Sequence, residues 1–139
     1  MACKYLDARQ TLHGKLLKRP LISKNRFFVN LAYKTYSNWN FDTTFNWNDG
    51  KRIPNTSSNP TEFQFMSRSP DFWICNAQIG KQIGKKLELY LGGENLFDFR
   101  QNRLISNPQN PFGSYFDASL VWGPVIGRMI YGGLRFTIR

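Results

Sequence analysis

Few side chains in this sequence could carry catalysis or bind a metal. His13 is the only histidine, and no second histidine or cysteine pair stands at a metal-ligand spacing from it. It also has no paired nucleophile by spacing, so we expect a surface residue and not a catalytic base. Cys3 and Cys75 could form a disulfide, but we expect two free thiols, with Cys75 on the apolar face of a strand. The residues therefore predict no enzyme and no catalytic, cofactor or metal site.

The carboxylates are dispersed and form no acid–base pair. Glu88 and Glu94 fall on the same face of one expected strand, and we expect them to pair with Arg128 or Arg135 on the neighbouring strand. The other scattered carboxylates considered are Asp42, Asp98 and Asp117.

The Gly92-Gly93 pair is not a phosphate-binding loop. No helix is expected after it, and a helix N-terminus is what would hold the phosphate. Glycines inside a strand instead indicate a bend or a close approach of another group.

The formal net charge of +10 suggests a polyanionic partner, such as nucleic acid, an anionic membrane surface or lipopolysaccharide. The cations form two clusters, the first containing Lys15, Lys18, Arg19, Lys24 and Arg26, and the second Lys81, Lys85 and Lys86. No nucleic-acid-binding motif accompanies them, so no nucleic-acid partner is expected.

Apolar and polar residues alternate along several stretches, as they do in β-strands with one apolar and one polar face. The alternation is strictest at residues 39–48, where the aromatic rings of Trp39, Phe41, Phe45 and Trp47 share one face. We expect strands at residues 4–12, 26–36, 39–48, 72–83, 87–99 and 128–139. Strands 26–36 and 39–48 should form a hairpin. The loops expected are 13–25, 49–71 and 100–127, and the short turns are 37–38 and 84–86.

The alternation of long loops with short turns is typical of an outer-membrane β-barrel. About ten residues at ~3.3 Å each, tilted by ~45°, span roughly the apolar height of such a membrane. Aromatic residues near the strand ends suit its aromatic belts: Phe27, Tyr33, Trp39, Trp47, Trp73, Phe97 and Phe99. The topology places Arg139 on the short-turn side. No apolar stretch is long enough for a transmembrane helix.

Several motifs resemble the TonB-dependent outer-membrane receptors. Residues 91–97 (LGGENLF) resemble the GxENL strand of this family, residues 115–129 its last extracellular loop, and residues 131–138 its final, barrel-closing strand. Residues 30–33 and 50–55 also look like pieces of such barrels. The resemblance implies a 22-stranded barrel with a plug domain inside, and uptake of a scarce cargo such as a metal chelate, cobalamin or a glycan. It also implies partners: outer-membrane lipid and lipopolysaccharide, the rest of the barrel and plug, and the TonB complex. In such a receptor Lys15, Lys18 and Arg19 would lie outside the cell and could meet lipopolysaccharide phosphates or an anionic cargo; the alternative is a solvated loop.

The sequence thus predicts an all-β fold, an antiparallel up-and-down meander of about six strands that is part of a larger transmembrane β-barrel. Residues 1–139 would be the C-terminal part of that barrel, in the outer membrane, without the plug and earlier strands and unable to transport alone. Residues 1–7 lack the apolar segment of a signal peptide, which fits a cytoplasmic protein and equally a fragment that has lost its export signal. The alternatives are a soluble basic antiparallel β-sheet binding module and, less favoured, a small complete barrel of porin type.

Overall fold

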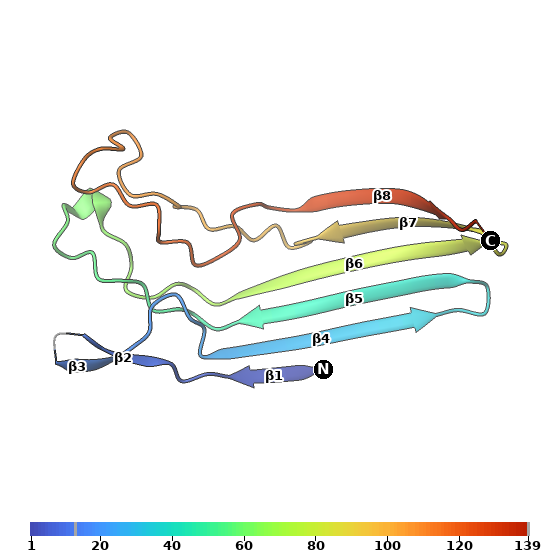
Figure 1. The fold of residues 1–139 in the computed structure, drawn as a ribbon, viewed down its shortest axis with the longest axis horizontal. Helices are drawn as coiled ribbons and strands as arrows, with labels where there is room; N and C mark the ends of the chain where they lie inside the picture. Colours follow the sequence, from blue (N-terminus) through green and yellow to red (C-terminus); the bar gives the residue numbers. More distant parts are fainter. Residues whose placement is uncertain (13, 139) are drawn as a thin grey trace.

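A six-stranded antiparallel sheet dominates the computed structural model, which describes residues 1–12 and 14–138 (Figure 1). In spatial order its strands are β1 (Ala2–Tyr5), β4 (Asn25–Lys34), β5 (Trp39–Asn48), β6 (Phe72–Ile83), β7 (Leu87–Glu94) and β8 (Met129–Phe136). Two short strands, β2 (Arg9–Leu12) and β3 (Lys15–Lys18), form a separate hairpin. The described residues contain a single 3-10 turn, η1 (Thr61–Phe63), and no α-helix. The prediction of an all-β, antiparallel meander is confirmed.

The connections differ in length at the two ends of the sheet. Short turns at residues 35–38 and 84–86 join β4 to β5 and β6 to β7, whereas residues 49–71 and 95–128 form long connections at the other end. Figure 1 shows these long segments gathered at one end, together with the β2–β3 hairpin. The alternation of long and short connections is therefore confirmed, as is the hairpin of β4 and β5. No helix of the described residues is long and apolar enough to cross a membrane.

Several strand boundaries differ from the predictions. The strand expected at residues 26–36 is β4, which ends at Lys34, and the strand expected at residues 128–139 is β8, which ends at Phe136. The strand expected at residues 4–12 is two strands in different sheets, and the loop expected at residues 13–25 contains β3. The strand expected at residues 87–99 ends at Glu94, because Asn95 has a positive φ of 49° that an extended strand does not allow. His13 and Arg139 lie outside the described residues, so the predictions for them stay untested.

The register of the sheet places apolar side chains on one face across every strand. Phe45 on β5 lies between Val29 on β4 and Cys75 on β6, and Leu89 pairs with Leu134 on β8. This apolar face is largely exposed, with Leu134 at 67% of its full accessibility. The tryptophans Trp39 (38%) and Trp73 (46%) on the same face are exposed as well. No second layer of the described chain covers this face.

The opposite face is polar and internally hydrogen-bonded. The side-chain amide of Asn30 donates to both carboxylate oxygens of Asp42 at 3.1 Å and to the Thr44 hydroxyl at 3.0 Å. The Tyr131 hydroxyl donates to Gln78 Oε1 at 3.1 Å, which joins β8 to β6 across β7. Cross-strand polar pairs of this kind hold the register of the sheet without an apolar core.

The apolar core lies at the long-loop end and not within the sheet. Ile53, Phe72, Leu120 and Trp122 are buried together, and the Phe99 ring stacks on Phe72 with centroids 4.8 Å apart. Phe99 was expected in an aromatic belt at a strand end. That prediction is wrong, because the ring packs into this core from the loop beyond β7.

Candidate functional site

The long connections fold into an ordered structure, which we call the loop layer (residues 19–24, 49–71 and 95–128). Backbone hydrogen bonds cross it: the Leu21 amide donates to the Arg52 carbonyl at 2.8 Å, and the Ile53 amide donates to the Ser67 carbonyl at 2.9 Å. The Gln101 amide likewise donates to the Pro124 carbonyl at 2.9 Å. Hydrogen bonds between distant backbone segments therefore connect the parts of the loop layer.

Gln101 is a central hydrogen-bonding residue of the loop layer. Its side-chain amide donates to the carbonyl oxygens of Arg103 (2.6 Å) and Leu120 (2.8 Å). Its Oε1 accepts from the backbone amides of Trp122 (2.8 Å) and Gly123 (3.2 Å). The residue is buried, so these four bonds replace water around backbone groups that are otherwise unpaired.

Lys51 joins the two long connections. Its Nζ donates to the Trp122 carbonyl and lies 5.6 Å from the centre of the Phe72 ring. Burial lowers the pKa of the Lys51 ammonium, and the nearby Arg26 charge lowers this pKa further. The half-buried ammonium thus stabilises the loop layer through its contacts with Trp122 and Phe72. Its removal from water makes the charged form less favourable, which is why its pKa is lowered.

Asn95 explains why the GxENL-like motif ends a strand. The side-chain amide donates to the carbonyls of Phe99 (2.8 Å) and Ile126 (3.3 Å), and Oδ1 accepts from the Phe99 amide (3.2 Å). Asparagine tolerates positive φ better than most residues and can bond to nearby backbone in this way. The turn also requires glycine at position 93, because a Cβ there would stand 2.6 Å from Leu96 Cδ2. The motif residues therefore build a tight, buried turn.

Two glycines of the resemblance motifs lie under tyrosine rings. Gly92 pairs with Tyr131 across β7 and β8, and a Cβ on Gly92 would collide with that ring. The neighbouring pair is reciprocal, because Gly133 lies opposite Tyr90 and is covered by its ring. Rings that cover strand glycines in this way stabilise an edge strand. The two glycines thus permit a close approach, as the sequence predicted for Gly92.

The predicted ion pairs are confirmed for one glutamate only. Arg135 Nη1 lies 2.8 Å from Glu88 Oε2 on the neighbouring strand. Glu94 is not brought to either arginine, because the register places Met129 opposite Glu94 and Arg135 opposite Glu88. The Arg128 backbone amide donates instead to Asp98 Oδ1 at 2.8 Å within the loop that follows β7. This hydrogen bond is the main cause that lowers the pKa of Asp98, and the Arg100 side chain, 3.5 Å away, adds to it.

The two cysteines are free thiols, as predicted. Cys3 is exposed on β1, and Cys75 is buried on the apolar face of β6. Among the described residues, no group of three or more histidine, cysteine or acidic side chains could hold a metal ion.

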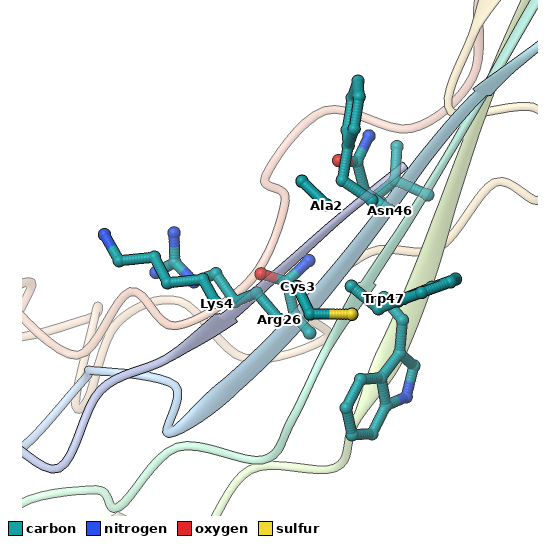
Figure 2. Close-up of a pocket in the computed structure, with 10 residues that line it drawn as sticks. Ala2, Cys3, Lys4, Arg26, Asn46 and Trp47 are labelled. Carbon is teal, nitrogen blue, oxygen red and sulfur yellow. The ribbon is translucent and has the colours of Figure 1, made fainter.

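One hollow lies against the sheet near β1, at the end of the sheet close to the loop layer (Figure 2). Lys4 and Arg26 are direct cross-strand partners, and Figure 2 shows their side chains extending in the same direction from the sheet. Like charges placed directly opposite each other repel, which disfavours this pairing in isolation. An anionic group near both side chains would relieve that repulsion.

Two further hollows flank the β2–β3 hairpin. The basic hollow, of about 310 Å³, is lined by Lys18, Ile22, Lys24, Asp49, Gly50, Arg52, Ser67 and Arg68. The hairpin hollow, of about 600 Å³, is lined by Gln10, Leu12, Lys15, Leu17, Pro20, Arg52, Pro54 and Asn55. The predicted basic cluster is thus only partly brought together: Lys15, Lys18 and Lys24 line these hollows. Arg19 lines neither of them, and Arg26 lines the hollow near β1 instead.

Arg52 and Arg68 complete this basic region, and sequence reasoning missed their part in it. They lie in residues 49–71, far from the lysines in sequence, and meet them only because the β2–β3 hairpin folds against that segment. The only signal available was the inclusion of Arg52 in a motif, residues 50–55, that resembles pieces of known barrels.

Comparison with known proteins gives no relative. The chain matches no family model, no curated protein and no solved structure.

Proposed function

We propose that this chain is part of the wall of a larger transmembrane β-barrel in an outer membrane. The observation that carries the proposal is the exposed apolar face that runs across all six strands, opposite a polar face. An exposed apolar surface of this extent is costly in water and favourable in lipid. The ten-residue strands β4 and β5 have a suitable length, since ten residues at ~3.3 Å, tilted by ~45°, rise about 23 Å.

The remaining strands of that barrel would come from outside this sheet. β1 and β8 are its outer strands, and six strands are fewer than the eight of the smallest single-chain barrels. In lipid, each unpaired backbone group on an edge strand costs several kcal/mol. Edges of this kind support pairing with further strands of the same barrel.

We further propose that the barrel is a TonB-dependent receptor for a scarce cargo, such as a metal chelate, cobalamin or a glycan. Support comes from the motif residues, several of which have specific structural roles: Asn95 closes the turn after β7, and Gly92 accommodates Tyr131. In this proposal the polar face lines the lumen beside the plug domain. The loop layer faces the outside and lipopolysaccharide. Transport requires the plug and the TonB complex, so this chain would not transport alone.

The soluble binding module is the rival hypothesis, and it requires the tryptophans of the sheet to be covered. Trp39 and Trp73 are both exposed on the apolar face, which favours the membrane proposal. The two hypotheses differ in what surrounds this face.

Two experiments test the proposal. Reading the coding DNA upstream of this chain tests the receptor proposal: a continuous frame encoding a plug domain and further strands would support it, and a stop codon would contradict it.

The proposal that the sheet is part of a membrane-spanning wall is tested on the product of that frame, reconstituted in liposomes. Single cysteines are introduced for labelling in a Cys3→Ser/Cys75→Ala background. A fluorophore on Ile79→Cys should be quenched by brominated lipid, whereas one on the adjacent, oppositely facing Gln78→Cys should not. Equal quenching of both labels would refute the proposal that only the apolar face of the sheet contacts lipid.

A further inference from the structure

We propose that the basic hollow and the hairpin hollow together form a binding site for a ligand that carries clustered phosphate groups. This site goes beyond the barrel proposal and does not depend on it. Its residues belong to the β2–β3 hairpin and the loop layer and not to the six-stranded sheet.

Arg52 makes the two hollows one site, because it lines both. Its Nη1 donates to the Lys18 carbonyl at 3.0 Å, and its carbonyl accepts from the Leu21 amide at 2.8 Å. The guanidinium is therefore anchored to the end of the hairpin before any ligand binds. A site that is already ordered loses less conformational freedom on binding.

The charge balance of the site strongly favours an anion. Its cations are Lys15, Lys18, Lys24, Arg52 and Arg68, and its lining contains one carboxylate, Asp49. Both oxygens of that carboxylate already have partners. Arg68 Nη2 lies 2.6 Å from Asp49 Oδ1, and the side-chain amide of Asn25 donates to Asp49 Oδ2 at 3.1 Å. The excess positive charge is thus left without an acidic partner in the lining, and a multiply charged anion would neutralise it.

The residue types favour phosphate groups. An arginine fork matches the geometry of phosphate oxygens, and lysines add mobile point charges around it. The cations are distributed over two adjoining hollows, which suits several phosphate groups better than one. Leu12, Leu17 and Pro54 line the hairpin hollow beside these cations and would contact a less polar part of the ligand. Such a ligand could be a phosphorylated lipid headgroup or a soluble polyphosphate.

The test uses the full chain refolded in detergent and titrated calorimetrically at low ionic strength. One probe is tripolyphosphate; the other is diphosphorylated lipid A carried in the same micelles. The site variant is Lys15→Gln/Lys18→Gln/Lys24→Gln. The control variant, Lys34→Gln/Lys85→Gln/Lys86→Gln, removes the same charge from exposed positions at the short-turn end. Circular dichroism verifies that both variants keep the strand content of the parent chain.

We expect the site variant to weaken binding by about tenfold and the control variant by less than about twofold. A specific loss with lipid A alone would identify a headgroup as the ligand, and a loss with tripolyphosphate alone would identify a soluble one. Equal losses in the two variants would overturn the proposal, because they would indicate attraction to the net charge of the whole chain. Absence of binding to both probes would overturn it as well. If the site variant loses its strand content, Arg52→Lys is used in its place, because this substitution keeps the charge and removes the forked guanidinium. Binding that is not weakened in Arg52→Lys would then overturn the proposal.

Discussion

Replacing Gln101 with leucine should open the loop layer. The substitution keeps a side chain of similar size and removes all four hydrogen bonds of the amide. The backbone amides of Trp122 and Gly123 and the Leu120 carbonyl would then be left without their side-chain partner in a buried site. A polar group stranded in this way costs more than the hydrogen bond itself is worth, because it has lost water as well.

The size of the effect follows from the number of stranded groups. Each buried, unsatisfied backbone group costs about 1–3 kcal/mol. With three such groups, and with some relaxation that readmits water, we expect the free energy of local opening to fall by about 3–6 kcal/mol. Since about 1.4 kcal/mol corresponds to a factor of ten, amide exchange in the opened segment should accelerate by about a hundredfold to ten-thousandfold.

Hydrogen exchange of the full chain, read at the Trp122 and Gly123 amides, measures this opening directly. The control is Gln109→Leu, the same substitution at an exposed position of the same long connection. Amides of the β4–β5 hairpin provide an internal reference, because the sheet should keep its protection. If Trp122 and Gly123 exchange no faster in Gln101→Leu than in Gln109→Leu, the hydrogen-bonding role of Gln101 is refuted.

Three further predictions concern the strands and the loop layer. Gly92→Ala should destabilise the β7–β8 pair by about 1–3 kcal/mol through its clash with the Tyr131 ring, and a Tyr131→Ser background should remove most of that cost; additive effects in denaturant unfolding would contradict the clash. Asn95→Ala should loosen the turn after β7 by about 2–4 kcal/mol and speed exchange of the Phe99 amide, whereas Asn95→Gly should recover the part due to positive φ. Lys51 has a lowered folded-state pKa, so the unfolded chain binds more protons between that pKa and the usual 10.5, and the stability of the loop layer should rise with pH across this window. A Lys51→Met variant should lack that part of the rise, and an unchanged slope of stability against pH would contradict the assignment.

The strands of the sheet were the most predictable part of the fold. β5 and β6 have the bounds expected from alternation alone, because each carries a long apolar face that only one register can align with its neighbours. The β2–β3 hairpin was missed because its residues show no clear apolar face. Its one local signal was Gly14, whose φ of 74° suits a tight hairpin turn.

The loop layer was less predictable for a different physical reason. Its order comes from single polar side chains that bond to distant backbone, as Gln101 does to Trp122 and Arg103 to the Gln64 carbonyl. Such contacts have no periodicity, so a sequence full of proline, serine and asparagine indicates only an irregular segment. The expected pairing of Glu94 with Arg128 or Arg135 failed because the sequence alone did not fix the register, which places Met129 opposite Glu94.

The two parts of the molecule therefore depend on different stabilising forces. The loop layer has a buried core around Trp122, to which β6 contributes Phe72, and its buried polar groups are internally hydrogen-bonded. The sheet has hydrogen-bonded strands and a polar face, but its apolar face remains exposed, and the outer edges of β1 and β8 have no partner strand within the described chain. Because burial of apolar surface is the dominant favourable contribution to folding, the sheet requires an apolar environment or another chain segment against that face.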